Sequence, residues 1–222
     1  MKYLVIDTET TGVNQSYVSE KKPLSLTKQS EIIQIAGLAL DEHYQVLHAF
    51  SFYCDAITAT SSDGAFKTHR LDLQDIRSKV PMQFFSVIAD TKLQILFEPD
   101  IMFIGKKVGF DMNMIGAGCR NCVSEWVKPK QTIRCREKHG RHMLDLNAVF
   151  RKRLSMYDNM LKEGRDKFFS EHTDLQIWGN SPELYLERKN MFHDAFYDVI
   201  NTYLLFEQMR KESYFGGEVY GR

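Results

Sequence analysis

Two acidic residues stand directly after a short apolar run near the start of the sequence. Residues 3–6 read Tyr-Leu-Val-Ile, and Asp7 and Glu9 follow at alternate positions. An uninterrupted apolar run predicts a buried strand, and alternate residues of a strand project to the same side. Neighbouring carboxylates repel each other unless a cation lies between them, and all-oxygen ligand sets suit Mg²⁺ or Mn²⁺. The pattern favours a metal site at this strand end, with two solvated acids as the alternative.

Two further acids follow elements that could bring them to the same place. Asp111 comes after a strand predicted over 101–104, at the start of a helix, where an N-cap is the commoner role. Asp198 lies on the apolar side of a helix predicted over 194–211, where an unpaired carboxylate is costly to bury. His193 shares a site with Asp198 only if it lies in the turn before that helix, because five helical residues span about 140°. There it suits a general base, and a surface histidine is the alternative.

These clusters, in this order, resemble the three motifs of the DnaQ-like 3′–5′ exonucleases, in the DEDDh branch of the ribonuclease H-like fold. The matching residues are Asp7-Thr8-Glu9-Thr10-Thr11-Gly12, then Phe110-Asp111, then His193 and Asp198. The resemblance spans nearly the whole chain and implies an α/β fold with a mixed five-stranded sheet flanked by helices. It also implies two divalent ions, Mg²⁺ or Mn²⁺, held by Asp7, Glu9, Asp111 and Asp198. His193 would then take the proton from the attacking water.

The resemblance further implies a substrate, which is the 3′ end of a single-stranded nucleic acid cut into nucleoside 5′-monophosphates. DNA is slightly favoured, as in proofreading or repair. RNA trimming, cleavage of short oligonucleotides and a non-catalytic nucleic-acid-binding module are the alternatives. The residues expected to contact this substrate are Thr10, Thr11, Gly12, Lys106, Lys107 and Phe110. Family members often carry His-Asn where Lys106 and Lys107 stand, so the contacts of these two lysines stay open. We expect any polymerase or repair protein that takes part to be a separate chain.

A basic stretch occupies the middle of a chain whose net charge is zero. Residues 106–153 hold 12 Lys and Arg against four Asp and Glu. This asymmetry favours a basic face that follows a phosphate backbone, with a solvated surface as the alternative. Four residues of the stretch also have the spacing of a small zinc finger, namely Cys119, Cys122, Cys135 and His139. Such a zinc would be structural, and ordinary reduced cysteines are the alternative.

The remaining sequence predicts how the chain is organised. Apolar runs over 31–40 and 45–53 predict two strands joined as a hairpin. Helices are expected from Met143 to Leu154 and over 156–170, and a loop-rich segment over 171–190.

We expect one DnaQ-like exonuclease domain over residues 1–222. Connections at about 13–30 and 151–190 are longer than usual and are interpreted as insertions. No apolar run approaches the roughly 18 residues of a membrane helix. Four cysteines without an export signal predict reduced thiols and a cytoplasmic location. The sequence makes no prediction of the oligomeric state.

Overall fold

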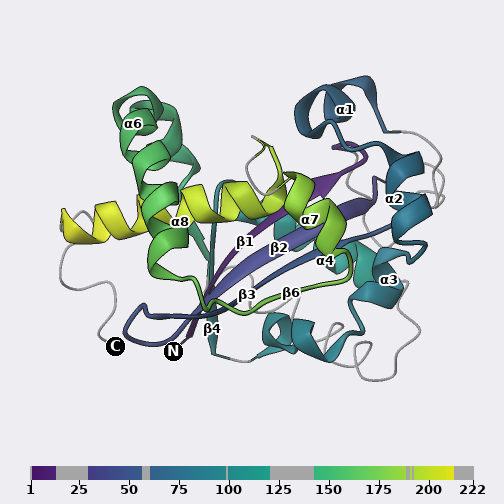
Figure 1. Cartoon of the computed structure of the whole chain (residues 1–222), viewed down its shortest axis with the longest axis horizontal. Helices are drawn as coiled ribbons and strands as arrows, with labels where there is room; N and C mark the ends of the chain where they lie inside the picture. The colour runs from purple at the N-terminus through teal and green to yellow at the C-terminus, as the bar shows by residue number, and fades with distance from the viewer. Residues whose placement is uncertain are drawn as a thin grey trace, which may run out of the picture.

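The computed structural model describes residues 2–13, 30–56, 61–98, 100–120, 143–188, 191 and 193–212. These residues form a mixed six-stranded sheet with helices on both faces (Figure 1). The strands are β1 (Lys2–Thr10), β2 (Ile32–Leu40), β3 (Val46–Tyr53), β4 (Ile101–Gly105), β5 (Met143–Asp145) and β6 (Ile177–Gly179). Their order in the sheet is β5-β4-β1-β2-β3-β6. β2 is antiparallel to both of its neighbours, and the other pairs are parallel.

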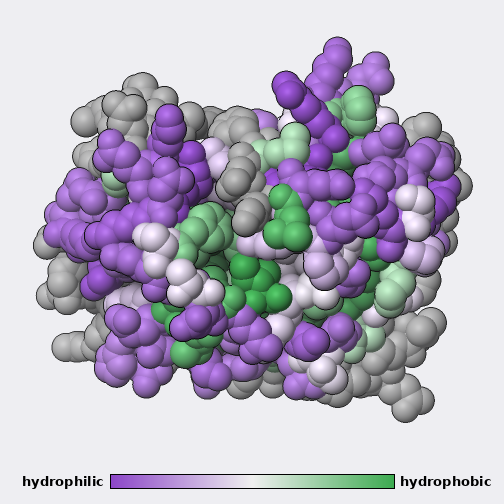
Figure 2. Space-filling model, viewed as in Figure 1, coloured by the Kyte–Doolittle hydropathy of each residue, from purple (hydrophilic) through white to green (hydrophobic). Residues whose placement is uncertain are grey.

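The helices divide between the two faces of the sheet. They are α1 (Asp63–His69), α2 (Leu73–Lys79), α3 (Phe84–Val87), the 3₁₀ helix η2 (Thr91–Phe97), α4 (Val108–Arg120), α6 (Asn147–Glu171), α7 (Pro182–Arg188) and α8 (Ala195–Lys211). One apolar cluster joins the sheet to α3, η2 and α4, and a second joins it to α6 and α8. On the face with α6, α7 and α8 toward the viewer, hydrophilic side chains dominate the rim and apolar ones gather near the middle (Figure 2).

β1 is central because its side chains are buried on both sides. Leu4 and Ile6 belong to the cluster under α4, whereas Tyr3 and Val5 belong to the cluster under α8. This alternation follows from the two-residue repeat of a strand. The odd-numbered residues that come after Val5 therefore project to the α8 side of the sheet.

The α/β fold with a mixed sheet and flanking helices agrees with the sequence prediction, and the sheet has six strands instead of five. The sixth is β6, which lies with α7 in the segment expected to be loop-rich. The expected helix from Met143 is also wrong at its start, because β5 pairs with β4 and α6 begins only at Asn147. From there α6 runs unbroken to Glu171. β5 and β6 have three residues each, too few for a recognisable period, so their conformation comes from pairing with a neighbouring strand.

Two expectations concern features that the structure describes only in part. Most of the proposed insertion at 13–30 lies outside the described residues.

None of the helices in the described part of the chain has both the length and the hydrophobicity needed to cross a membrane.

Candidate active site

β1 carries the first two acids to the α8 side of the sheet. Asp7 and Glu9 continue the row of Tyr3 and Val5, and they pair with Ala36 and Gln34 of β2. The Glu9 side chain is buried, with 8% of its surface exposed, whereas Asp7 is partly exposed. An apolar strand thus ends in two acids that face the first turn of a helix.

The second motif reaches β1 through a tight turn between β4 and α4. A Cβ atom on Gly105 would lie 3.0 Å from the carbonyl oxygen of Ile6 and 2.9 Å from Cβ of Val108. Asp111 follows in the first turn of α4, where its Oδ1 accepts hydrogen bonds from the backbone N–H of Thr8 at 3.1 Å and from its hydroxyl at 2.7 Å. Asp111 is therefore bonded to the first motif and is not the N-cap of α4.

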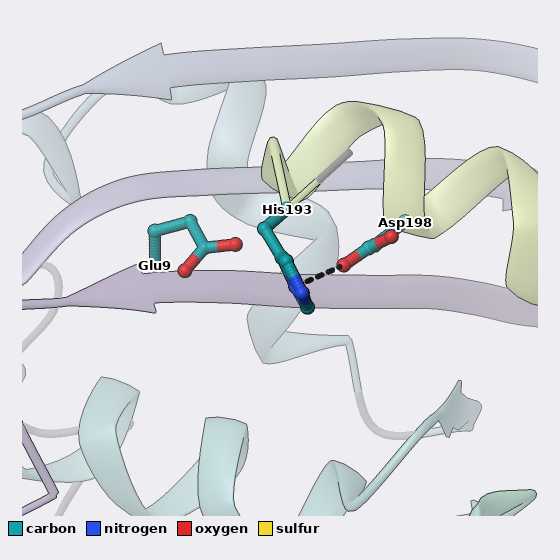
Figure 3. A group of neighbouring side chains, drawn as sticks. All are labelled: Glu9, His193 and Asp198. Atoms are coloured by element: carbon teal, nitrogen blue, oxygen red, sulfur yellow. Dashed lines mark ion pairs between the residues drawn. The ribbon is translucent and has the colours of Figure 1, made fainter. Parts of the chain in front are cut away.

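The third motif lies at the N-terminus of α8. Asp194 is the N-cap of this helix and accepts a hydrogen bond from the N–H of Phe196 at 3.0 Å. His193 precedes it in a turn and has a left-handed backbone conformation, with φ 61°. Its Nδ1 lies 3.7 Å from Oδ2 of Asp198. Figure 3 shows Glu9 from β1 beside these two side chains, and one possible ligand atom from each of the three lies within 4.8 Å of the others.

The electrostatics join all four acids into one cluster. Burial, followed by repulsion from Asp111, Asp198 and Glu9, raises the pKa of Asp7 well above its ordinary value. Burial and repulsion from Asp198 and other acids raise the pKa of Glu9 to about 9. Burial also raises the pKa of Asp111 to about 7, although its hydrogen bonds from Thr8 oppose the rise. Each acid thus disfavours ionisation of the others, and a divalent cation with oxygen ligands would relieve the repulsion.

The residues after the acids of the first motif hold the end of β1 in place. The Thr10 hydroxyl donates to the carbonyl of Gly12 at 2.7 Å, and the Thr11 hydroxyl accepts from the N–H of Glu31 at 2.9 Å. The Thr11 N–H donates to the carbonyl of Glu31, and the Thr11 carbonyl accepts from the N–H of Ser62. Because Thr10 and Thr11 are buried and these groups are bonded internally, their predicted contacts with a nucleotide stay a prediction.

The turn between β4 and α4 presents the residues of the second motif. Lys106 is partly exposed, and its charge lowers the pKa of Asp7. Lys107 is exposed in a left-handed conformation, and its N–H donates to Oδ1 of Asp145 at 3.0 Å. Phe110 is partly buried against the apolar cluster under α4. Lys106 is thus the lysine that the structure brings close to the acids.

The proposed zinc ligands are described only in part. Cys119 is buried within the cluster between α4 and the sheet, which suits a structural thiol. Cys122, Cys135 and His139 lie outside the described residues, as does much of the basic stretch. Zinc binding therefore stays a prediction.

A buried polar network around Asp194 was not predicted as part of the site. Oδ2 of Asp194 accepts hydrogen bonds from Nε2 of Gln34 at 3.0 Å and from the hydroxyl of Tyr53 at 3.3 Å. Nε of Arg188 lies 3.5 Å from the same oxygen. The sequence contains a signal for Gln34, because it is a polar residue inside an otherwise apolar strand. Arg188 has no such signal, because arginine is usually exposed and its burial depends on tertiary packing.

Comparison with known protein families gives a match over most of the chain. Residues 4–206 match the family model RNase_T, which is described as an exonuclease. No curated protein matches the sequence significantly.

Solved structures of exonuclease I from E. coli share the fold. The complex with a dA16 oligonucleotide is 19% identical with a TM-score of 0.56, and the match covers 95% of this chain and 41% of that one. The complex with dT13 is 18% identical with a TM-score of 0.56, covering 96% and 41%. The zinc-bound complex with single-stranded DNA is 16% identical with a TM-score of 0.57, covering 95% and 40%.

The chain thus spans about two fifths of those exonuclease I chains. At these identities the solved structures establish the fold alone. The family match covers most of the sequence, and it shows that the chain belongs to the RNase_T exonuclease family.

Proposed function

We propose that the protein is a metal-dependent 3′–5′ exonuclease that releases nucleoside 5′-monophosphates from single-stranded nucleic acid, with DNA favoured. The main observation is the cluster of acids from β1, α4 and α8, in which burial and then mutual repulsion raise the pKa of Asp7 and Glu9. Such a cluster is unfavourable for the protein alone and suits divalent cations. Membership in the exonuclease family supports phosphodiester hydrolysis as the reaction.

Asp7, Glu9, Asp111 and Asp198 are the residues that would hold two divalent ions. Bound there, the ions would supply activation of the attacking water and stabilisation of the leaving 3′ oxygen. Thr8 holds Asp111 against β1 through two hydrogen bonds, which fixes the distance between the strand and the helix that carry these ligands. The protein thereby provides a ligand set from three separate elements.

His193 is proposed to take the proton from the attacking water. In the tautomer with a proton on Nδ1, the neighbouring Asp198 carboxylate orients the ring, and Nε2 is the atom that accepts the proton. Its proximity to both Glu9 and Asp198 also allows a role as a metal ligand. The His193→Ala variant distinguishes these two roles, because only loss of a metal ligand would lower the affinity for Mn²⁺.

The preference for DNA is proposed from the solved structures that share the fold. The structures of E. coli exonuclease I that share the fold hold single-stranded DNA oligonucleotides, which favours DNA over RNA for this chain. A single domain over residues 1–222, a separate polymerase or repair partner and a cytoplasmic location stay predictions from the sequence.

A nuclease assay with matched strands tests the proposal. DNA and RNA of the same sequence, labelled at the 5′ end, are incubated with Mg²⁺, Mn²⁺ or EDTA. We expect a metal-dependent ladder that shortens from the 3′ end and is absent with Asp7→Ala. Asp174→Ala, which removes an exposed acid between α6 and β6, serves as the matched control and should be as active as the wild type. No shortening of either strand with either metal would contradict the proposed function.

A further inference from the structure

We propose that Arg188 of α7 is a positioning residue for His193 and acts through its ion pair with the N-cap Asp194. The inference rests on the proposed function, because it concerns the residue that would accept the proton. It assigns a role in the reaction to α7, a helix in the segment that the sequence indicates only as an insertion.

Asp194 has more partners than a helix cap requires. Its side chain is buried, with 1% exposed, and Oδ1 caps α8 through the N–H of Phe196. Oδ2 accepts hydrogen bonds from Gln34 of β2 and Tyr53 of β3. It also forms an ion pair with Arg188 of α7, whose Nε lies 3.5 Å away and makes no hydrogen bond to any described residue. A buried carboxylate is costly unless it is fully bonded. The position of the first residue before α8 is therefore fixed from three different elements.

Arg188 is held in turn by the end of α1. Its side chain is buried, with 8% of the residue exposed. Nη2 donates to the carbonyl of His69, and Nη1 donates to the carbonyl of Arg70 at 3.5 Å. The planar guanidinium can serve two carbonyls and a carboxylate at once, which a lysine ammonium does less well. Arg188 thus connects the end of α1 to the start of α8.

The backbone ties the His193 turn to the same arginine. The N–H of Met191 donates to the carbonyl of Arg188 at 2.7 Å, and the N–H of Asp194 donates to the carbonyl of Met191 at 3.1 Å. His193 lies inside this turn with φ 61°, a conformation that is unfavourable for a residue with a Cβ and must be maintained by its surroundings. The bond at the start of the turn is made by the backbone of residue 188 whatever its side chain, so the arginine side chain acts on the turn through its ion pair with Asp194.

This arrangement separates His193 from three of the four acids of the site. Asp7 and Glu9 lie on β1 and Asp111 lies on α4, and neither of these two elements forms the His193 turn. Asp198 lies on α8, where its N–H donates to the carbonyl of Asp194 at 2.9 Å. Loss of the arginine should therefore displace the histidine while most of the metal ligands stay in place. The expected effect is on the rate of the bound complex, with little effect on substrate or metal affinity.

A double-mutant cycle tests whether the arginine acts through the histidine. Arg188→Met and Arg188→Lys are compared in the wild-type and His193→Ala backgrounds. We expect Arg188→Met to lower kcat about 10–100-fold with KM and the Mn²⁺ requirement within about threefold, and Arg188→Lys to recover part of the loss. In the His193→Ala background, Arg188→Met should change kcat less than threefold. Equal losses in the two backgrounds would overturn the inference.

Arg210→Met is the matched control, because Arg210 also forms an ion pair but lies at the far end of α8. It should leave kcat unchanged. Tyr53→Phe provides a second probe that keeps the ring in the core and removes only the hydroxyl bonded to Asp194. Tyr53→Phe should lower kcat by about 3–10-fold. This second variant tests the inference even if Arg188→Met does not fold.

Hydrogen exchange separates failure of this inference from failure of the proposed function. The amides of Met191 and Asp194 should exchange at least tenfold faster in Arg188→Met than in the wild type, whether or not the protein degrades nucleic acid. A wild type without nuclease activity would contradict the proposed function alone. Unchanged exchange of both amides in the folded variant would overturn the positioning role by itself.

Discussion

Thr8 donates two hydrogen bonds to a single oxygen of Asp111, from its backbone N–H at 3.1 Å and from its hydroxyl at 2.7 Å. The residue between the two acids of β1 therefore binds the third acid, which comes from α4. Alternation along the strand makes this possible, because Asp7 and Glu9 face α8 while Thr8 faces the opposite layer. A three-residue stretch of sequence thus supplies two of the proposed metal ligands and the group that positions a third.

Thr8→Val should weaken metal binding. The substitution keeps the shape of the side chain but removes one hydrogen bond to a carboxylate, which contributes about 1.5–3 kcal/mol when the acceptor is charged. We expect the Mn²⁺ concentration for half-maximal activity to rise about tenfold or more, and calorimetric titration should show the same loss. Thr8→Ser retains the hydroxyl and is the control. Equal Mn²⁺ affinity of Thr8→Val and the wild type would show that the hydroxyl has no such role.

The metal-free protein should lose stability as the pH rises. Folding raises the pKa of Glu9 from 4.5 to about 9 and that of Asp111 from 3.8 to about 7. At a pH between the ordinary and the raised pKa of each acid, the folded state binds more protons than the unfolded state. The free energy of unfolding therefore falls as the pH increases. The stabilisation is complete below about pH 4 and is lost by about pH 9. Urea unfolding in EDTA at pH 5, 7 and 9 measures this change.

Mn²⁺ should reduce that pH dependence, because the bound cation keeps the acids ionised. Glu9→Gln should reduce it as well, since this variant removes the acid with the pKa of about 9. An unfolding free energy in EDTA that is constant between pH 5 and 9 would contradict the raised pKa values.

His193→Ala distinguishes a proton acceptor from a metal ligand. As a general base, the histidine should contribute about 10²–10⁴-fold to kcat without affecting metal affinity. We therefore expect a large loss of kcat and a Mn²⁺ titration curve like that of the wild type. A comparable loss of Mn²⁺ affinity would instead assign His193 to the ligand set with Glu9 and Asp198. His172→Ala, at the end of α6, is the control.

Gly105→Ala should affect both stability and activity. A Cβ at this position would lie 3.0 Å from the backbone oxygen of Ile6, which cannot move without disturbing β1. Strain of this kind typically costs about 1–3 kcal/mol, and the displaced turn carries Asp111. Urea unfolding should show the loss of stability, and kcat should fall with it. Gly109→Ala is the control, because a Cβ there meets no atom within 4 Å.

The sequence predicts those parts of the fold and site that depend on local pattern. The apolar runs of β1, β2 and β3 mark three adjacent strands, and the position of Asp194 at the start of α8 is also found from the sequence. These features depend on the spacing of apolar residues along a short run and on the residue that caps a helix, both of which can be seen in the local sequence. The prediction therefore places His193 in the turn before the helix, where the structure has it.

The missed features depend on tertiary packing. β5 and β6 are short edge strands, each determined by a longer neighbour and not by its own residues. Arg188 is buried where its guanidinium contacts two carbonyls at the end of α1 and the carboxylate before α8, and these groups come from distant parts of the sequence. Thr8 lies within a recognised motif, yet its bond to Asp111 depends on how closely α4 approaches β1. The local sequence pattern does not predict how close these two elements lie.

The order in which the acids occur along the chain bears on synthesis. Asp198 lies 191 residues after Asp7 in the sequence. At about 5–20 residues per second, roughly 10–40 s separate the first ligand from the last. The four acids therefore cannot come together until α8 has been synthesised, and a divalent cation that needs all four finds no complete site on the nascent chain before then.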